Sequence, residues 1–266
     1  FERDGKKFIP LYESKMIYTY NHRYGDFADS NHERSHVLPR ISSDRLNNSN
    51  YLVTPYYWIA ESEVYNKALS LEWEHQWFFS WRRVTDSRAS ARTLVATVIP
   101  WYGSGDSLFL AIFKHPQMMR LYACFQANLG SLVLDYVVRQ KLGGLNLNFF
   151  TFKQLPILEP TRYSEIDLVF IVPRVIELSY TAYDLTPWAR DLGYSGDPFV
   201  YDLNRRAQLS AELDAYYARL YGLTRDELRY ILDPADVMGE DYPSETFRVL
   251  KKNEIREFGE YRTRRL

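Results

Sequence analysis

The spacing of apolar residues changes along the chain, and this change limits the folds that it can form. In the first part, short apolar segments such as 92–99 and 108–113 are separated by turn-forming residues, as is typical of strands. Between Gln117 and Gln140 the apolar residues recur every three or four positions, which predicts one long amphipathic helix ending at Gly143. The sequence therefore predicts a mixed α/β (α+β) fold.

The remaining elements follow from shorter patterns. We expect two short strands around a turn in 8–20, strands over 51–58, 77–84 and 147–152, and a short helix over 61–68. Residues 21–50 are polar and lack apolar periodicity, so we expect a long loop there.

The second half of the chain is predicted to be mainly helical. A helical stripe covers 203–221, and Thr224 and Glu227 have the spacing of a capping box at the start of the next helix. From Arg248 to Arg265, seven Lys and Arg alternate with acidic residues, which is typical of a solvated face. We place a boundary near Pro160, between a small mixed-sheet domain (1–160) and a helical region (161–266).

Composition excludes several classes of protein. The chain has 266 residues, a formal net charge of −1 and one cysteine, Cys124. These values exclude a histone-like basic field, a disulfide framework and a zinc site built from cysteines. No apolar run approaches the roughly 20 residues of a membrane span, and the N-terminus carries no secretory signal. We therefore expect no membrane partner and a reducing, cytoplasmic location.

One string has the spacing of a zinc protease motif. Residues 32–36 (HERSH) match H-E-x-x-H, in which a helix places both histidines on one face, and Glu61 or Glu63 would supply a third ligand. The string lies in a polar, Asn-rich segment, however, and Arg34 takes a position that should face the core. This context argues against a metal site, and we expect none.

A second string resembles a nuclease motif. Restriction-type nucleases hold Mg²⁺ with an aspartate and the glutamate of an E-x-K strand, a pattern that Asp4, Glu13 and Lys15 could supply. Short E-x-K strings are common, so a surface strand with alternating charge is the simpler interpretation. The chain also lacks a glycine-rich phosphate loop and a nucleophile elbow. We therefore predict no catalytic residues in this chain.

Two groups of basic and polar residues suggest DNA binding. Arg82, Arg83, Arg88 and Arg92 follow the aromatic segment 77–81 and could grip phosphates or read guanine edges. The second group, after the long helix, comprises Lys141, Asn146, Asn148 and Lys153. The alternative is that both groups are solvated faces beside a core strand.

Several segments, taken in order, carry a resemblance to a known family. They are 11–17 (LYESKMI) with 21–23 (NHR), 54–59 (TPYYWI), 81–93 (WRRVT to ART), 145–158 (LNLNFF to KQLPIL) and 221–232 (YGL, DEL and IL). Together they resemble the C-terminal target-recognition region of fused adenine-specific DNA methyltransferases. That family comprises type IIG-like restriction-modification enzymes and related phage-defence enzymes, and this region is related to the specificity domains of type I systems. Ser14 stands where the family usually has glycine, and Ser90-Ala91 replaces Asn-Glu.

The resemblance implies that this chain binds double-stranded DNA sequence-specifically for an adenine-N6 methyltransferase, which must extrude its target base. Because the chain begins at Phe1 and ends in charged sequence, we expect a piece of a longer parent chain. The resemblance places the catalytic N-P-P-Y-type motif and the S-adenosylmethionine site in an N-terminal methyltransferase domain, so this fragment needs no cofactor. The expected DNA contacts are Arg82, Arg83, Arg88, Arg92, Lys15, His22, Arg23, Lys141, Asn146, Asn148 and Lys153. A Mg²⁺-dependent nuclease and a protein-interaction module remain as alternatives.

Overall fold

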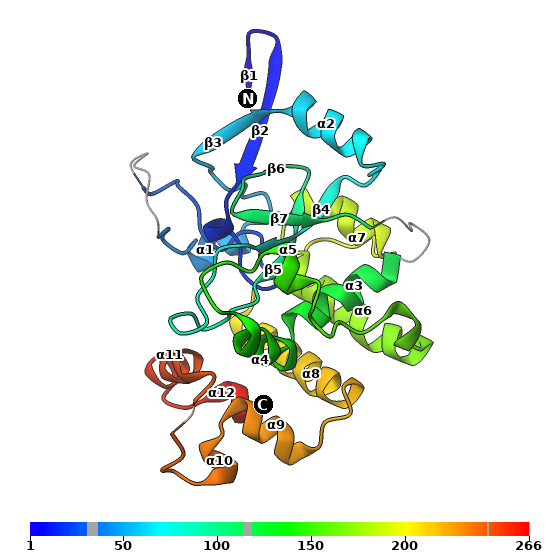
Figure 1. Ribbon diagram of the computed structural model, residues 1–266. Coiled ribbons are helices and arrows are strands. Elements are labelled where there is room, and N and C mark those ends of the chain that lie inside the picture. The colour runs from blue at the N-terminus through cyan, green and yellow to red at the C-terminus, as the bar shows by residue number, and fades with distance from the viewer. Residues whose placement is uncertain (31–36, 114–118, 244, 266) are drawn as a thin grey trace. The chain divides into compact units, whose positions relative to one another are not determined.

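The chain folds into two units, each assembled from segments that are distant in the sequence. The computed structural model of the protein describes residues 1–30, 37–113, 119–243 and 245–265 (Figure 1). Unit 1 comprises residues 1–83, 95–126 and 163–201, and unit 2 comprises 84–94, 127–162 and 202–266. This division differs from the single boundary expected near Pro160, because the chain returns to unit 1 at residue 163 and leaves it again after residue 201.

Unit 1 contains two small sheets, which confirms the predicted mixed α/β class. In the first sheet the strands β1 (Glu2–Arg3), β2 (Lys6–Tyr12) and β3 (Tyr57–Ala60) are antiparallel, and β6 (Gly103–Ser104) pairs with β2 in parallel. In the second sheet β4 (Trp77–Arg82) is the central strand between β5 (Ala96–Pro100) and β7 (Leu108–Ala111), and both pairings are antiparallel.

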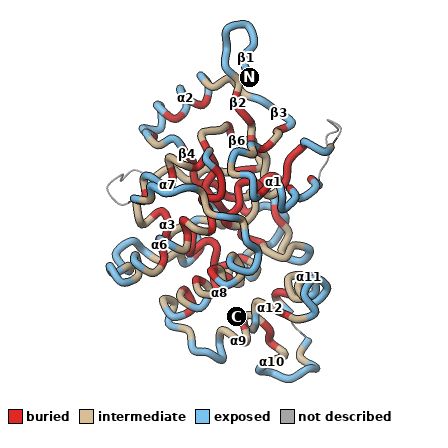
Figure 2. The backbone as a smooth tube through the Cα atoms, turned by 180° about the vertical axis from the view of Figure 1, so that it is seen from behind, coloured by how far each residue is buried: buried red, intermediate tan, exposed pale blue. Residues whose placement is uncertain are grey.

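Strand β4 is buried along nearly its whole length (Figure 2). On one side Trp77 packs edge-on against Trp188 of α7 (Thr186–Asp191), with ring centroids 4.6 Å apart. On the same face Phe79 packs against Phe125 of α3 (Met119–Gly130) at 4.9 Å, and on the opposite face Phe78 stacks on Trp101 at 5.0 Å. A strand covered on both faces has no solvent side, which explains why residues 77–81 are a continuous apolar run interrupted only by Ser80.

The described part of the polar segment 21–50 is irregular, as expected of a loop, apart from the helix α1 (Ser43–Asn47), and a buried arginine binds its main chain. The buried guanidinium of Arg23 donates hydrogen bonds of 2.8–3.3 Å to the main-chain oxygens of Leu46, Asn48, Tyr51 and Thr181. These bonds satisfy carbonyls that no sheet or helix partner reaches. The segment therefore folds around an arginine, and its low hydrophobicity does not indicate mobility.

The other helices of unit 1 are short and medium in length. They are α1 (Ser43–Asn47), α2 (Glu61–Ser70) and α6 (Glu165–Ser179), with 3-10 turns at Ser14–Met16 and Tyr183–Leu185. The helix expected over 61–68 is thus confirmed. The second strand expected in 8–20 is wrong, because a 3-10 turn and an isolated bridge between Tyr18 and Asn21 occupy that stretch.

Unit 2 is helical among its described residues. Its helices are α4 (Leu132–Lys141), α5 (Phe149–Phe152), α8 (Leu203–Leu220), α9 (Arg225–Leu232), α10 (Ala235–Met238), α11 (Arg248–Phe258) and α12 (Arg262–Arg265), with a 3-10 turn at Pro160–Arg162. The predicted capping box of α9 is present: Thr224 and Glu227 bond reciprocally across the first turn. Leu132, Ile231 and Phe247 form a buried cluster that joins α4, α9 and the start of α11.

Two expectations for residues 117–152 were wrong. The predicted long helix is broken at Ser131, whose hydroxyl caps α4 by accepting a hydrogen bond from Leu134 N. The strand expected over 147–152 is instead the short helix α5, capped in the same way by Asn148. No single described helix is long and apolar enough to cross a membrane, although α3 and α4 taken together have the required length and composition.

Candidate functional site

Three of the predicted contact residues in unit 1 are held by internal partners. His22 is buried, and its Nε2 lies 3.0 Å from Oδ1 of Asp184. Arg23 is the buried anchor described above. Arg82 donates to the main-chain oxygen of Ile17, and its burial lowers the pKa of the guanidinium. These side chains stabilise unit 1.

The other two predicted residues of unit 1 are partly accessible but paired. The Lys15 ammonium lies 3.4 Å from the Glu13 carboxylate and 4.8 Å from the ring centroid of Phe27. The Arg83 guanidinium lies 2.6 Å from the Asp106 carboxylate. Neither pair is sealed from solvent, but each has a local electrostatic explanation that requires no ligand.

In unit 2, a buried carboxylate organises the segment that carries Arg88 and Arg92. Asp135 of α4 is fully buried and accepts hydrogen bonds from Thr93 N at 3.0 Å and Leu94 N at 2.8 Å. The Arg92 side chain lies 3.5 Å from the same carboxylate and donates to the Gly130 oxygen at the end of α3. Arg92 is therefore a structural cation, because a buried carboxylate needs a partner of this kind.

Arg139 holds the same segment from the next turn of α4. Its guanidinium donates hydrogen bonds to the oxygens of Ser87, Ser90 and Ala91 at 2.8–3.0 Å, and to the Thr246 oxygen at 3.1 Å. It also lies 4.7 Å from the ring centroid of Phe247. The sequence analysis missed this residue, although its spacing of four from Asp135 on a predicted helix is the signal of an ion pair.

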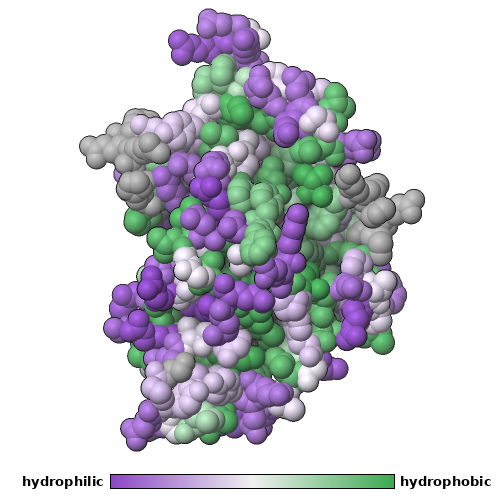
Figure 3. All heavy atoms as spheres, in the orientation of Figure 1, coloured by the Kyte–Doolittle hydropathy of each residue, from purple (hydrophilic) through white to green (hydrophobic). Residues whose placement is uncertain are grey.

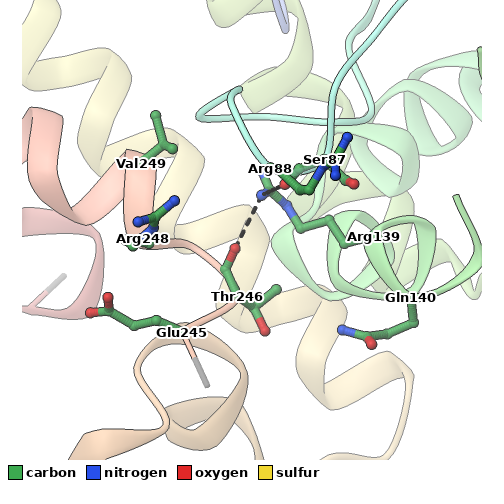
Figure 4. A pocket seen from close by; sticks show the side chains of 8 residues that line it. All are labelled: Ser87, Arg88, Arg139, Gln140, Glu245, Thr246, Arg248 and Val249. Atoms are coloured by element: carbon green, nitrogen blue, oxygen red, sulfur yellow. Dashed lines mark hydrogen bonds between the residues drawn. The ribbon is translucent and has the colours of Figure 1, made fainter. Parts of the chain in front are cut away.

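A cavity of about 260 Å³ opens beside this guanidinium (Figure 4). It is lined by Ser87, Arg88, Arg139, Gln140, Glu245, Thr246, Arg248 and Val249. Arg88 and Arg248 are exposed and border the cavity from two separate segments, 84–94 and the first turn of α11. Because Arg139 forms hydrogen bonds with both segments, it fixes the main chain beside Arg88 and beside Arg248.

The second predicted group also belongs to unit 2. Lys141, Asn146, Asn148 and Lys153 are exposed around the end of α4 and the short helix α5. Asn148 uses its Oδ1 to accept a hydrogen bond of 3.1 Å from Thr151 N, whereas the side chain of Asn146 makes no hydrogen bond with the described residues. The main chain of Asn146 pairs with Val84, which joins this group to the segment that carries Arg88.

Helix α11 adds a row of cations that the sequence analysis interpreted only as a solvated face. Arg248, Lys252 and Arg256 are exposed and follow one another at intervals of four residues, so they share one side of the helix. Lys251 belongs to a different side, where it pairs with Asp233 and Glu245. Charges that alternate along the sequence thus lie on two faces of α11: the cation Lys251 forms ion pairs, whereas Arg248, Lys252 and Arg256 form none with the residues that the structure describes.

The structure separates the residues of the nuclease hypothesis. Asp4 lies in the exposed turn between β1 and β2, and Glu13 follows the far end of β2. The part of the surface that the turn between β1 and β2 forms is hydrophilic (Figure 3, in the orientation of Figure 1). Seven residues of extended strand span roughly 23 Å, so these carboxylates do not share one metal ion. No group of three His, Cys, Asp or Glu that could hold a metal occurs within the described ranges. The 32–36 string lies outside the described residues.

Comparisons of this chain with protein-family models, with curated proteins and with solved structures found no match.

Proposed function

We propose that this chain recognises specific sequences in double-stranded DNA for an adenine-N6 DNA methyltransferase whose catalytic domain precedes it in a longer parent chain. The observation that supports DNA binding most is the set of accessible cations in unit 2, two of which, Arg88 and Arg248, lie on segments that Arg139 binds. The methyl-transfer context comes from the sequence resemblance alone. S-adenosylmethionine would bind in the preceding domain.

The accessible cations supply the sequence-independent part of binding. Arg88, Lys141, Lys153 and the α11 row (Arg248, Lys252 and Arg256) are exposed, and each can neutralise a phosphate and release a counterion. Phosphate contacts fix the register of a protein on the duplex without reading its sequence. These six side chains would therefore set the position of unit 2 on DNA.

Base reading requires groups with free hydrogen-bonding edges. An asparagine pairs with adenine through both its amide oxygen and its amide nitrogen. Asn148 has already committed its oxygen to the cap of α5, but Asn146 has both atoms available. We therefore assign adenine contact to Asn146 rather than to Asn148, and keep Arg88 as a phosphate contact.

Binding of the full chain to a random pool of duplexes, followed by sequencing of the bound fraction, tests this function. We expect a preferred sequence to emerge, and binding to it to weaken steeply with salt. Arg88→Ala and Arg248→Ala should each reduce the steepness of the salt dependence by about one phosphate contact. Lys67→Ala, which removes an exposed cation from α2 in unit 1, is the matched control and should leave binding unchanged.

Two results would contradict the proposal. The first is the absence of salt-sensitive affinity for any duplex at low salt. The second is equal binding by the wild type, the two unit 2 variants and the Lys67→Ala control, which would place the DNA-binding surface elsewhere or exclude one.

A further inference from the structure

Several apolar side chains are exposed around α5. Phe149 and Phe150 belong to α5, Leu145 lies in the connection from α4, and Val84 pairs with Asn146 of that connection. The exposed fractions are 45% for Val84, 51% for Leu145, 46% for Phe149 and 76% for Phe150. Single exposed apolar residues are ordinary, but four in two short paired segments form the kind of patch that marks a contact surface. Phe150 is the most exposed of them and projects from a helix of only four residues.

These rings stand on a well-anchored support. Leu147 is fully buried, and Thr85 N donates a hydrogen bond of 2.9 Å to the Leu145 oxygen. Asn148 caps α5 at its start, and Lys153 N closes the helix by donating to the Phe149 oxygen at 3.0 Å. Because this main chain is fixed, only the side-chain torsions of the rings remain to be ordered when they contact a partner.

The charge around this patch favours a polyanion as the partner. Residues 136–158 contain no aspartate or glutamate, and Lys141 and Lys153 are the accessible cations of this stretch. Lys141, Lys153 and the amide of Asn146 are exposed on the same stretch as the two rings. A partner that combines negative charge with flat apolar faces matches this surface, and nucleic acid bases flanked by phosphates have both properties.

We infer that Phe150 stacks its ring on an exposed base of the bound DNA, while Lys141 and Lys153 contact the flanking phosphates. This inference rests on the proposed function and adds to it a specific contact. It assigns to Phe150 an energetic role in binding that is independent of salt, because stacking neutralises no phosphate and releases no counterion.

The test compares three substitutions at Phe150 in the full chain, on the duplex selected from the random pool and on the same duplex with a single abasic site. Phe150→Ala removes the ring, Phe150→Leu keeps an apolar side chain without an aromatic face, and Phe150→Trp keeps the aromatic face. Tyr65→Ala, an exposed aromatic of α2 in unit 1, is the matched control. Affinity is measured by fluorescence anisotropy across a salt series.

We expect Phe150→Ala and Phe150→Leu to weaken binding by about tenfold with an unchanged salt slope, and Phe150→Trp and Tyr65→Ala to bind as the wild type does. We also expect the wild type to lose affinity on a duplex whose abasic site removes the stacked base, since the ring then has no stacking partner. Wild-type binding of Phe150→Ala, or equal binding of Phe150→Leu and the wild type, would overturn the stacking role while leaving DNA recognition intact. If the wild type itself binds no duplex, both proposals fail.

Discussion

Arg23 donates hydrogen bonds to four main-chain oxygens. Its substitution therefore tests directly whether one buried side chain holds the described part of 21–50 in place. Arg23→Ala would remove the guanidinium donor from the oxygens of Leu46, Tyr51 and Thr181, whereas the Asn48 oxygen would keep its hydrogen bond from Tyr51 N. We expect a loss of about 3–5 kcal/mol in the free energy of unfolding, measured by urea denaturation followed by circular dichroism.

Arg23→Lys should recover only a small part of this loss, because one ammonium cannot reproduce the fork geometry of a guanidinium. Arg3→Ala, which removes an exposed arginine, is the control and should change stability by less than about 0.5 kcal/mol. Similar stability of Arg23→Ala and Arg3→Ala would show that the 21–50 segment does not depend on this anchor.

Asp214 gives a residue-scale prediction about pH. It lines a cavity of about 730 Å³ in unit 2, and its Oδ1 accepts a hydrogen bond of 2.7 Å from Leu132 N. Burial raises the pKa of Asp214 to about 6, although the Arg92 charge and the Leu132 hydrogen bond act in the opposite direction. A carboxyl with a higher pKa in the folded chain favours folding when it is protonated. Its contribution to stability therefore increases as the pH falls from about 6 to about 4.

Asp214→Asn should remove the cost of this buried charge while keeping an oxygen for Leu132 N. We expect the variant to be more stable than the wild type by about 2 kcal/mol at about pH 7, and the difference to vanish near about pH 4. Urea denaturation at a series of pH values measures both quantities. A variant that is less stable at neutral pH would contradict the assignment.

Residue types alone could not separate structural cations from accessible ones. The sequence analysis grouped Arg82, Arg83, Arg88 and Arg92 because they are close in the chain. The structure places Arg82 and Arg83 in unit 1 and Arg88 and Arg92 in unit 2, and only Arg88 is exposed. The partners that distinguish them, such as the Ile17 and Gly130 oxygens, lie far away in the sequence and carry no pattern.

At the scale of elements, two side chains of α4, Asp135 and Arg139, hold the segment 84–94 by hydrogen bonds to its main chain. Arg139→Gln would remove the hydrogen bonds to the oxygens of Ser87, Ser90, Ala91 and Thr246. We expect the amides of this segment to exchange with deuterium at least about tenfold faster, because the segment would open locally without global unfolding. Peptide-level hydrogen exchange by mass spectrometry measures this change.

The control for this prediction is Arg256→Gln, which removes an exposed cation from α11 of the same unit. It should leave exchange in 84–94 unchanged. If Arg139→Gln and Arg256→Gln behave alike, Arg139 does not hold the segment, and the fixed position of Arg88 loses its support.

Elements with a strong apolar period were predictable, and those set by capping were not. A continuous apolar run located β4, and the helical period located α8, each to within a few residues. The helical period also continued across Ser131. There the Ser131 hydroxyl accepts a hydrogen bond from Leu134 N and starts a new helix, so the apolar stripe is divided between α3 and α4. At 149–152 the apolar residues suited a strand, but the Asn148 cap selects a helical turn.

At the scale of the whole molecule, the mixed α/β class was predictable but the division into units was not. Composition changes little near residues 84, 127 and 202, where the chain passes between units. The segment 84–94 belongs to unit 2 because the Asp135 carboxylate binds two of its amides and Arg139 binds three of its oxygens. Polar contacts between residues about 45 positions apart leave no periodic pattern in the sequence.

The salt dependence of duplex binding by the full chain tests the central claim most directly. The claim assigns phosphate contacts to Arg88, Lys141, Lys153, Arg248, Lys252 and Arg256. Six contacts predict a log–log slope of about −5, so affinity for the selected duplex should fall on the order of 10³-fold between about 50 and about 200 mM salt. A slope near zero, or no binding to any duplex at the lower salt concentration, would contradict it.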